Sequence, residues 1–449
     1  MSNFTNKLES RLMPIASAIS KNKYLVSIRD GFLVSMPLLV VGSMIMLFSN
    51  FPIPAWMDLL RSTYLNDVTI AAWLSSATQA TFSIMSIFIV LGIGYNFALR
   101  MKVEPLFGGA VALLGWFTLM PFTTSFTPEG ATEAVLVPSV PLDWLGAKGI
   151  FIGIISAFLA VHIYHYVVKK GWTIKMPAGV PPTVANSFSA LIPISMVIFA
   201  FLAVRLIFIL TPWGNAFDFV FKFLQLPLQN VGDSLGAMIV VYLFAHVLWF
   251  FGIHGTNITD SVFSPILYAL SANNVAAIEA GLQPPHIITK QFQDLFATFG
   301  GAGSTLSLLI AVLAVAKSKR LKQLGKLSIV PGIFGINEPV IFGLPVVLNP
   351  VIAVPFIFVP MINIIISWVT MNIGLVPITN GVIMPWTTPP IISGFLSSGW
   401  QGAVLQIFLI ALGIVLYLPF VRAMDKTYVI EENTVTIDEE EISFDDLTL

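Results

Sequence analysis

Residues 235–257 read LGAMIVVYLFAHVLWFFGIHGTN, and this stretch decides the class of fold. Its first part, Leu235–Phe251, contains no Lys, Arg, Asp or Glu and is long enough to cross the hydrocarbon core of a bilayer as a helix. A glycine and several polar residues follow at once, including His254 and Asn257. Irregular backbone at membrane depth persists only where protein or a water-filled cavity satisfies its N–H and C=O groups. The stretch therefore indicates a membrane protein in which a broken segment marks a site.

The composition of the whole chain supports this reading. Of 449 residues, 56% are apolar and 10% are charged, whereas soluble domains carry roughly 25% charged residues. The net charge of −1 offers no concentrated basic face for phosphates, which argues against a nucleic-acid partner. The absence of cysteine excludes disulfides, Cys-ligated metals and a thiol nucleophile in this chain. His162 and His165 have no third ligand nearby, so the sequence predicts neither a metal site nor a cofactor.

Nine stretches are long and apolar enough to span a bilayer. They are Phe32–Phe48, Ile70–Leu99, Leu106–Met120, Ile150–Val168, Ala190–Leu210, Leu235–Phe251, Gly300–Ala316, Val346–Val376 and Gly402–Val421. Clusters of Lys and Arg fall in alternate connections, and the positive-inside rule places these connections and both termini in the cytoplasm. If Gly300–Ala316 is to deliver the basic run that begins at Lys317 to the cytoplasm, one more crossing must precede it. Val262–Ala280 is the best candidate for this tenth crossing. We therefore predict an all-α polytopic fold with about ten transmembrane helices.

Three apolar segments are interrupted by glycine, proline and polar residues: Gly252–Pro265, Pro331–Asn349 and Val376–Gly394. Since broken helices line transport sites and all three segments follow residue 230, the second half is predicted to hold the substrate. The expected organisation is a cytoplasmic amphipathic segment (1–30), a scaffold and interface half (31–212), an amphipathic connector (213–230), a substrate-binding half with re-entrant segments (231–424) and an acidic, disordered tail (425–449).

Glu338 is the one carboxylate inside a long apolar region, in the sequence Gly-Ile-Asn-Glu-Pro at 335–339. An intramembrane acid is costly to bury, so it is either functional or paired with a neighbour. The following proline favours an extended backbone at Glu338, as the tip of a hairpin requires. This residue is the leading candidate for chemistry.

Other candidates are weaker. His254 could face a cavity or be a satisfied core group. Trp386 lies in the broken sequence NGVIMPWTTPP at 380–390, where its ring could stack on the apolar face of a sugar. Arg100 at the end of a span is more often a positive-inside anchor than a ligand.

Four motifs in order suggest a family: MPAGVPPTVANSF at 176–188, WFFGIHGTN at 249–257, GINEPVIFG at 335–343, and the sequence at 380–390. With these motifs the chain resembles enzyme IIC, the membrane component of the phosphoenolpyruvate-dependent sugar phosphotransferase system, in its lactose, cellobiose and diacetylchitobiose branch. The similarity covers residues 1–425. Each motif alone is weak, but the combination is specific.

The resemblance implies a homodimer of ten-helix subunits in the plasma membrane, with two re-entrant hairpins and the sugar held in the second half. It implies that Glu338 and His254 are catalytic and hold the 6-hydroxyl of a disaccharide, where the phosphocysteine of a separate IIB protein delivers phosphate. Glu338 fits the role of base and His254 that of orienting group, although the reverse is also open. Further contacts with the sugar are expected from Asn337, Trp249, Trp386, Asn257 and Arg100.

The predicted function is therefore a permease for a β-linked disaccharide of diacetylchitobiose or cellobiose type, with the choice between them open. A secondary transporter in which Glu338 binds a coupling proton or Na⁺ is the alternative. A membrane enzyme acting on a lipid-linked glycan has less support, because no Asp-x-Asp pair lies at a membrane face. The basic run Lys317–Lys326 could attract an acidic face of IIB or could serve topology alone.

Overall fold

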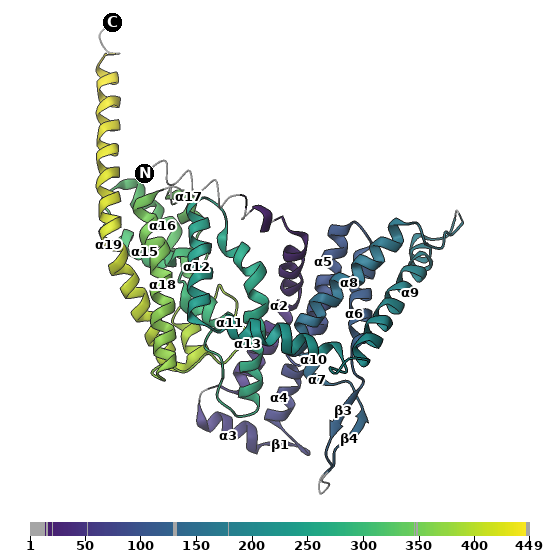
Figure 1. Ribbon diagram of the computed structural model, residues 1–449. Helices are drawn as coiled ribbons and strands as arrows, with labels where there is room; N and C mark the ends of the chain where they lie inside the picture. The colour runs from purple at the N-terminus through teal and green to yellow at the C-terminus, as the bar shows by residue number, and fades with distance from the viewer. Residues whose placement is uncertain are drawn as a thin grey trace. The chain divides into compact units, whose positions relative to one another are not determined.

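The computed structural model describes residues 14, 17–19, 21–51, 53–128, 133–177, 179–344, 346 and 349–445. Most of the predicted N-terminal amphipathic segment lies outside this range. The described residues form two compact units, which we call the N-terminal and C-terminal units. The N-terminal unit comprises Ser17–Asp233 and Asp260–Gln283, and the C-terminal unit comprises Pro14, Ser234–Thr259 and the described residues from Pro284 to Asp445. Both are built almost wholly from helices (Figure 1).

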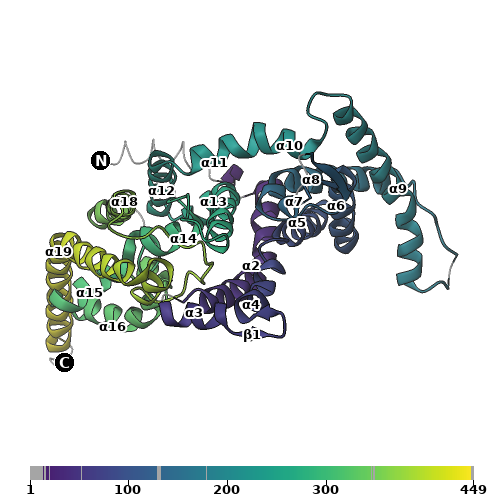
Figure 2. The same ribbon diagram turned by 90° about the horizontal axis from the view of Figure 1, so that it is seen from below.

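The elements of the N-terminal unit are α2 (Lys23–Ser49), α3 (Pro54–Ser62), β1 (Tyr64–Leu65), β2 (Val68–Thr69), α4 (Ile70–Gln79), α5 (Met85–Met101), α6 (Pro105–Leu119), β3 (Thr123–Phe126), β4 (Val135–Pro138), α7 (Leu142–Leu145), η1 (Ala147–Gly149), α8 (Ile150–Lys169), α9 (Pro182–Ile209), α10 (Ala216–Val220), η2 (Phe221–Gln225), α11 (Leu226–Gly232) and most of α13 (Gly255–Glu279). The strands form two antiparallel hairpins, β1 with β2 and β3 with β4. Helices α5, α6 and α8 lie side by side (Figure 2).

Small residues set the close packing of the N-terminal unit. A Cβ added at Gly31 on α2 would lie 2.3 Å from a side-chain atom of Ile93 on α5. A Cβ at Gly94 would lie 2.5 Å from the Cβ of Ala112 on α6. In membranes such small residues let helix backbones approach closely, which compensates for the missing hydrophobic force between helices.

Residues 260–283 pack with the N-terminal unit, although the sequence analysis assigned them to the second half. The ring of Tyr268 on α13 stacks on that of Phe32 on α2, with centroids 5.4 Å apart. A Cβ at Gly232 would lie 2.4 Å from the Ile266 side chain. The predicted connector 213–230 is helical and also lies in this unit, where the rings of Trp213 and Phe223 are 4.6 Å apart.

The elements of the C-terminal unit are α12 (Leu235–Phe250), α14 (Lys290–Phe292), η3 (Gln293–Ala297), η4 (Ala302–Ser304), α15 (Thr305–Val315), α16 (Lys319–Ile333), α17 (Glu338–Gly343), α18 (Pro350–Asn372) and α19 (Ile392–Asp445). Helix α15 packs against α16 and α19, and α12 packs against α18. Their buried side chains form one hydrophobic cluster that includes Trp249, Ala302, Val340 and Phe356.

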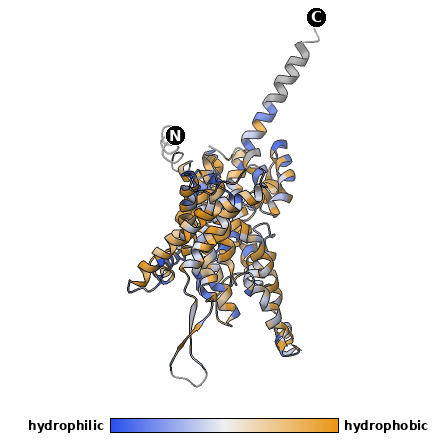
Figure 3. Cartoon of the chain, turned by 90° about the vertical axis from the view of Figure 1, so that its right-hand side faces the viewer, coloured by the Kyte–Doolittle hydropathy of each residue, from blue (hydrophilic) through white to orange (hydrophobic). Residues whose placement is uncertain are grey.

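Within the described residues, seven helices are long and apolar enough to cross a membrane, or eight if one bent pair counts as a single span. Helices α5 and α6 are shorter apolar helices. Hydrophobic residues predominate on the helices (Figure 3). The predicted crossing Val262–Ala280 is indeed helical, as part of α13. The count of ten crossings stays a prediction.

Two further sequence expectations differ from the structure. The predicted span Ile70–Leu99 is two helices, α4 and α5, with a turn at residues 80–84 between them. The acidic tail from residue 425 was expected to be disordered, but α19 continues to Asp445. At the start of this tail, the side chains of Asp425 and Glu432 bind the first turn of α16, which accounts for the order of the tail there. Residues 446–449 lie outside the described part of the chain.

Candidate functional site

A glycine-rich turn, Gly300–Gly303, precedes α15 and is here called the glycine turn. Gly300, Gly301 and Gly303 all have positive φ values, of 75°, 92° and 77°, which L-residues with a Cβ rarely adopt. A Cβ at Gly303 would lie 2.1 Å from the Phe356 ring. The backbone of the turn therefore occupies space in which no side chain fits.

His246 on α12 holds the glycine turn. Its buried ring donates from Nδ1 to the Tyr242 carbonyl (2.8 Å) and accepts at Nε2 the N–H of Gly303 (3.0 Å). The carbonyl of Gly303 in turn accepts a hydrogen bond from the Tyr417 hydroxyl. Because both ring nitrogens are used inside the protein, His246 is neutral in the Nδ1–H tautomer and has a structural role.

Residues Gly335–Glu338, here called the hairpin tip, connect α16 to α17 and contact the glycine turn. The tip is tight, since Gly335 has a φ of 81° and the N–H of Ile336 donates to the Pro331 carbonyl (3.0 Å). The buried side chain of Asn337 donates from Nδ2 to the Ala302 carbonyl (2.9 Å). Asn337 therefore fastens the tip to the glycine turn and fixes the backbone next to Glu338.

Glu338 is the first residue of α17, and its side chain is exposed. In the part of the chain that the structure describes, its carboxylate forms no hydrogen bond and no ion pair. The alternative of an acid paired with a neighbour therefore has no support among these residues. The carboxylate is available as an acceptor.

His254 lies between α12 and α13 and caps the latter. Its Nδ1 accepts the N–H of Asn257 (3.3 Å) and lies 3.1 Å from the Thr256 hydroxyl. An imidazole that accepts at Nδ1 carries its hydrogen on Nε2 when it is neutral. The His254 ring is exposed, and in its neutral form it carries its hydrogen on Nε2.

The turn that places His254 depends on two glycines. Gly252 has a φ of 78°, and a Cβ at Gly255 would lie only 1.9 Å from the Ala245 carbonyl oxygen. The His254 ring lies 4.3 Å from the ring of Trp249, centroid to centroid. Residues 249–257 therefore fold into a compact turn in which the His254 imidazole is exposed.

The hydrophobic cluster of the C-terminal unit links these parts. Trp249, which contacts His254, belongs to the same cluster as Ala302 of the glycine turn and Val340, two residues after Glu338. Trp386 is half exposed and lies against the tip, since a Cβ at Gly335 would lie 3.0 Å from its ring. The C-terminal unit thus combines an unpaired carboxylate, an imidazole donor and an exposed indole around one core.

The family model described as "Phosphotransferase system, EIIC" matches residues 29–360. The chain belongs to this EIIC family. It is 39% identical over 98% of its length to the lichenan permease IIC component of Bacillus subtilis and covers 97% of that protein. It is 38% identical to the cellobiose-specific EIIC component of Geobacillus stearothermophilus, with 96% of each chain covered.

Among solved structures, this EIIC chain is similar to the transporter ChbC, the IIC component of an N,N'-diacetylchitobiose-specific phosphotransferase system. The TM-score is 0.91 at 40% sequence identity, over 95% of this chain and 99% of ChbC. The predicted fold class, an all-α polytopic membrane protein of the phosphotransferase-system IIC type, is confirmed.

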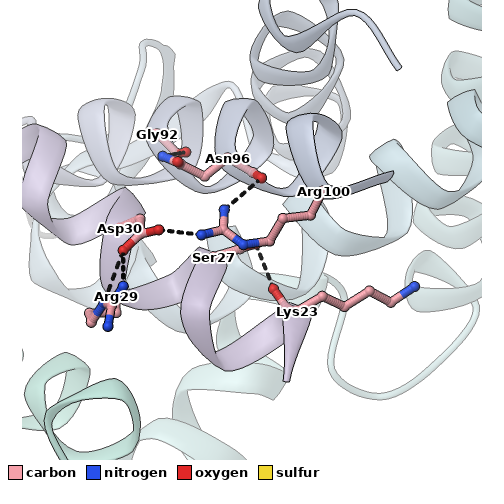
Figure 4. Close-up of polar contacts among 7 residues, drawn as sticks. All are labelled: Lys23, Ser27, Arg29, Asp30, Gly92, Asn96 and Arg100. Carbon is pink, nitrogen blue, oxygen red and sulfur yellow. Dashed lines mark hydrogen bonds and ion pairs between the residues drawn. The ribbon is translucent and has the colours of Figure 1, made fainter. Parts of the chain in front are cut away.

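Arg100 of this EIIC chain belongs to the N-terminal unit, whereas the other candidates belong to the C-terminal unit. Its guanidinium pairs with Asp30 of α2 and donates to the Asn96 carbonyl (2.9 Å), while Asp30 also pairs with Arg29 (2.8 Å; Figure 4). The structure therefore gives Arg100 a packing role between α2 and α5. Its contact with sugar is an untested expectation.

Several polar groups inside the C-terminal unit were not predicted from the sequence. Lys290 and Asp294 form an ion pair of 2.7 Å and are largely buried. Their spacing of four residues in an apolar stretch was a signal that could have been used. Gln406 on α19 donates to the Leu295 carbonyl (2.7 Å) and accepts the N–H of Gly394 (3.0 Å). Gln406 thereby anchors the end of the broken segment that contains Trp386.

Proposed function

We propose that this EIIC chain transports a β-linked disaccharide of cellobiose or diacetylchitobiose type and presents its 6-hydroxyl to the phosphocysteine of a separate IIB protein. The named specificities of the cellobiose-specific relative and of ChbC support this substrate class. The observation that carries the proposal is the Glu338 carboxylate, unpaired among the described residues, at a hairpin tip that Asn337 bonds to the glycine turn and whose Gly335 lies against Trp386.

The proposed reaction needs little covalent chemistry from this chain. The sugar 6-hydroxyl attacks the phosphorus of phosphocysteine, an O–P bond forms, the P–S bond breaks, and the thiolate stays on IIB. Glu338 accepts the proton that the hydroxyl loses, which is general-base catalysis by a positioned carboxylate. Catalysis otherwise consists of holding the attacking and leaving atoms in line.

His254 is assigned to orientation and not to proton removal. With Nδ1 accepting the Asn257 N–H, its Nε2–H is a donor that would bind a sugar oxygen. Trp249 supports this ring, and Trp386 offers its exposed face to a pyranose. Asn337 is assigned to fixing the tip, because its amide N–H donates to Ala302.

Replacing His254 with alanine is expected to weaken disaccharide binding about tenfold, which corresponds to about 1.4 kcal/mol for the lost hydrogen bond. Equilibrium exchange of radiolabelled cellobiose in vesicles measures this affinity. His165→Ala, a histidine change in the N-terminal unit, is the control and should leave the affinity unchanged. Equal affinities for the two variants would remove His254 from the binding site.

Group translocation and ion coupling predict different requirements for uptake. In inverted-membrane and proteoliposome assays with IIB already phosphorylated on its cysteine, we expect the sugar to appear only as its 6-phosphate. A proton or Na⁺ gradient without phosphorylated IIB should drive no accumulation. Gradient-driven accumulation of unmodified disaccharide would instead establish the secondary-transporter alternative.

We further propose a homodimer in the plasma membrane with both termini in the cytoplasm. The alternating clusters of Lys and Arg support this orientation. Large apolar side chains are exposed along α9, for example Phe199 and Leu206, and provide a surface for lipid or for the second copy.

A further inference from the structure

The start of α16 is bound by two carboxylates that come from far along the chain. Asp425 on α19 accepts the backbone N–H groups of Lys317 (2.9 Å) and Ser318 (2.8 Å). Glu432, two turns further along α19, accepts those of the next two residues, at 3.1 and 2.9 Å. The first N–H groups of a helix have no partner within the helix. Here α19 supplies those partners with negatively charged groups, which also suit the positive end of the helix dipole.

Ser318 completes this arrangement as the N-cap of α16. Its Oγ accepts the N–H of Leu321 (3.2 Å) and donates to the Glu432 carboxylate (2.7 Å). Charge-assisted hydrogen bonds of this kind are about twice as strong as neutral ones. Each backbone N–H group in the first turn of α16 therefore has a hydrogen-bond acceptor, and most of these acceptors lie on α19.

The contacting residues of α19 share one face. Asp425, Tyr428 and Glu432 are spaced i, i+3 and i+7, which aligns them along the helix. The Tyr428 ring lies 4.6 Å from the guanidinium carbon of Arg320 on α16, a cation–π contact. Asp425 is only 7% exposed. We call these three residues the clamp.

The other end of α16 carries the hairpin tip with Glu338. Helix α16 has 15 residues and is about 22 Å long at 1.5 Å per residue. The tip is tied to its last turn, and α17 returns alongside it, since a Cβ at Gly343 would lie 2.4 Å from Leu324. A shift of α16 along its axis therefore moves Glu338 by a similar distance.

The packing of α16 on its neighbours resists such a shift weakly. Its buried positions are Leu321, Gly325, Ser328 and Gly332, three of which are small. Small side chains permit close approach but form shallow ridges, which interlock less along the helix axis. The clamp, by contrast, fixes individual N–H groups at the first turn.

We propose that Asp425 and Glu432 are positioning residues for the phosphoryl transfer, because they set the axial position of α16 from its first turn, while the bond from Asn337 to Ala302 holds the other end, and both together place the Glu338 carboxylate. This inference rests on the base role given to Glu338 under the proposed function. Neither clamp carboxylate touches the sugar; each acts through α16.

The test compares Glu432→Gln with Glu431→Gln. The control removes the same charge one residue away, at an exposed side chain that has no hydrogen bond among the described residues. We expect Glu432→Gln to lower kcat for sugar phosphorylation about tenfold or more, since misplacing a catalytic group by 1 Å can cost about a hundredfold. The KM for cellobiose should change less. Glu431→Gln should match the unmodified protein.

A distance measurement separates positioning from general damage. The chain has no cysteine, so nitroxide labels can be attached at Gln323→Cys on α16 and Thr427→Cys on α19, both exposed. We expect one narrow distance distribution that broadens with Glu432→Gln and is unchanged with Glu431→Gln. Loss of kcat without broadening, or broadening without loss of kcat, would overturn the proposal.

Ser318→Ala provides a second, milder variant in case Glu432→Gln is not inserted. It removes one donor to Glu432 and the N-cap oxygen but keeps both carboxylates. We expect a smaller fall in kcat, and kcat equal to that of the unmodified protein would count against the clamp. The failure of the proposed function is recognised separately, by a Glu338→Gln variant that remains active.

Discussion

Glu338→Gln is expected to lower the rate of sugar phosphorylation about 10²- to 10⁴-fold, the range that general-base catalysis contributes. Glutamine keeps the size of the side chain but cannot accept the proton of the 6-hydroxyl. Because the wild-type carboxylate is exposed and unpaired among the described residues, the exchange should leave folding and membrane insertion intact. The measurement is the initial rate of disaccharide 6-phosphate formation with purified IIB that carries phosphocysteine.

The control for this experiment is Glu431→Gln, which makes the same chemical change on α19. Exchange of labelled sugar without phosphoenolpyruvate reports whether Glu338→Gln still binds its substrate. Retained binding with lost phosphorylation is the expected combination. Near-normal phosphorylation by the variant would remove Glu338 from the base role.

The second large effect is expected from Gly303→Ala in the glycine turn. The added methyl would lie 2.1 Å from the Phe356 ring, at a φ of 77°. The left-handed conformation costs about 1–2 kcal/mol for a residue with a Cβ, and overpacking a tight core costs about 1–3 kcal/mol more. Relieving the clash also strains the bonds of Gly303 to His246 and Tyr417. We expect a lower Tm of the detergent-solubilised protein and loss of sugar binding.

Gly374→Ala is the matched control for Gly303→Ala. Gly374 also has a positive φ, of 76°, but a Cβ there meets no atom within 4 Å. Gly374→Ala should lower the free energy of unfolding only by the cost of the left-handed backbone, about 1–2 kcal/mol, and should bind sugar as well as the unmodified protein. Equal losses in the two variants would show that the contact with Phe356 is unimportant.

Hydropathy predicted the individual spans well because the length of an apolar helix is a local property. The predicted span Leu235–Phe251 and the helix Leu235–Phe250 differ by one residue. Helix ends were less predictable where the membrane does not define them. Helix α9, for example, begins at Pro182, eight residues before the predicted span. The turn between α4 and α5 lies within one apolar stretch, so a count of apolar residues does not detect it.

The sequence indicated which residues could form the candidate site. It did not indicate which hydrogen bonds between distant segments hold them in place. Glu338 stood out because a charge is rare in an apolar stretch. The bonds from Asn337 to Ala302 and from His246 to Gly303 join residues 35 and 57 positions apart, and no local pattern indicates them. The clamp was missed for a different reason. Acidic residues in a polar tail are usually solvated, and the backbone N–H groups that bind Asp425 and Glu432 have no signature in the sequence.

The clamp also has a consequence for biogenesis. Ser318 and Asp425 are 107 residues apart, so at about 5–20 residues per second the ribosome needs roughly 5 to 20 s to deliver the carboxylate after the serine. During that interval the first turn of α16 has its own Ser318 cap but lacks both carboxylates. The geometry that the clamp gives to α16 is therefore complete only after more than a hundred further residues have been synthesised.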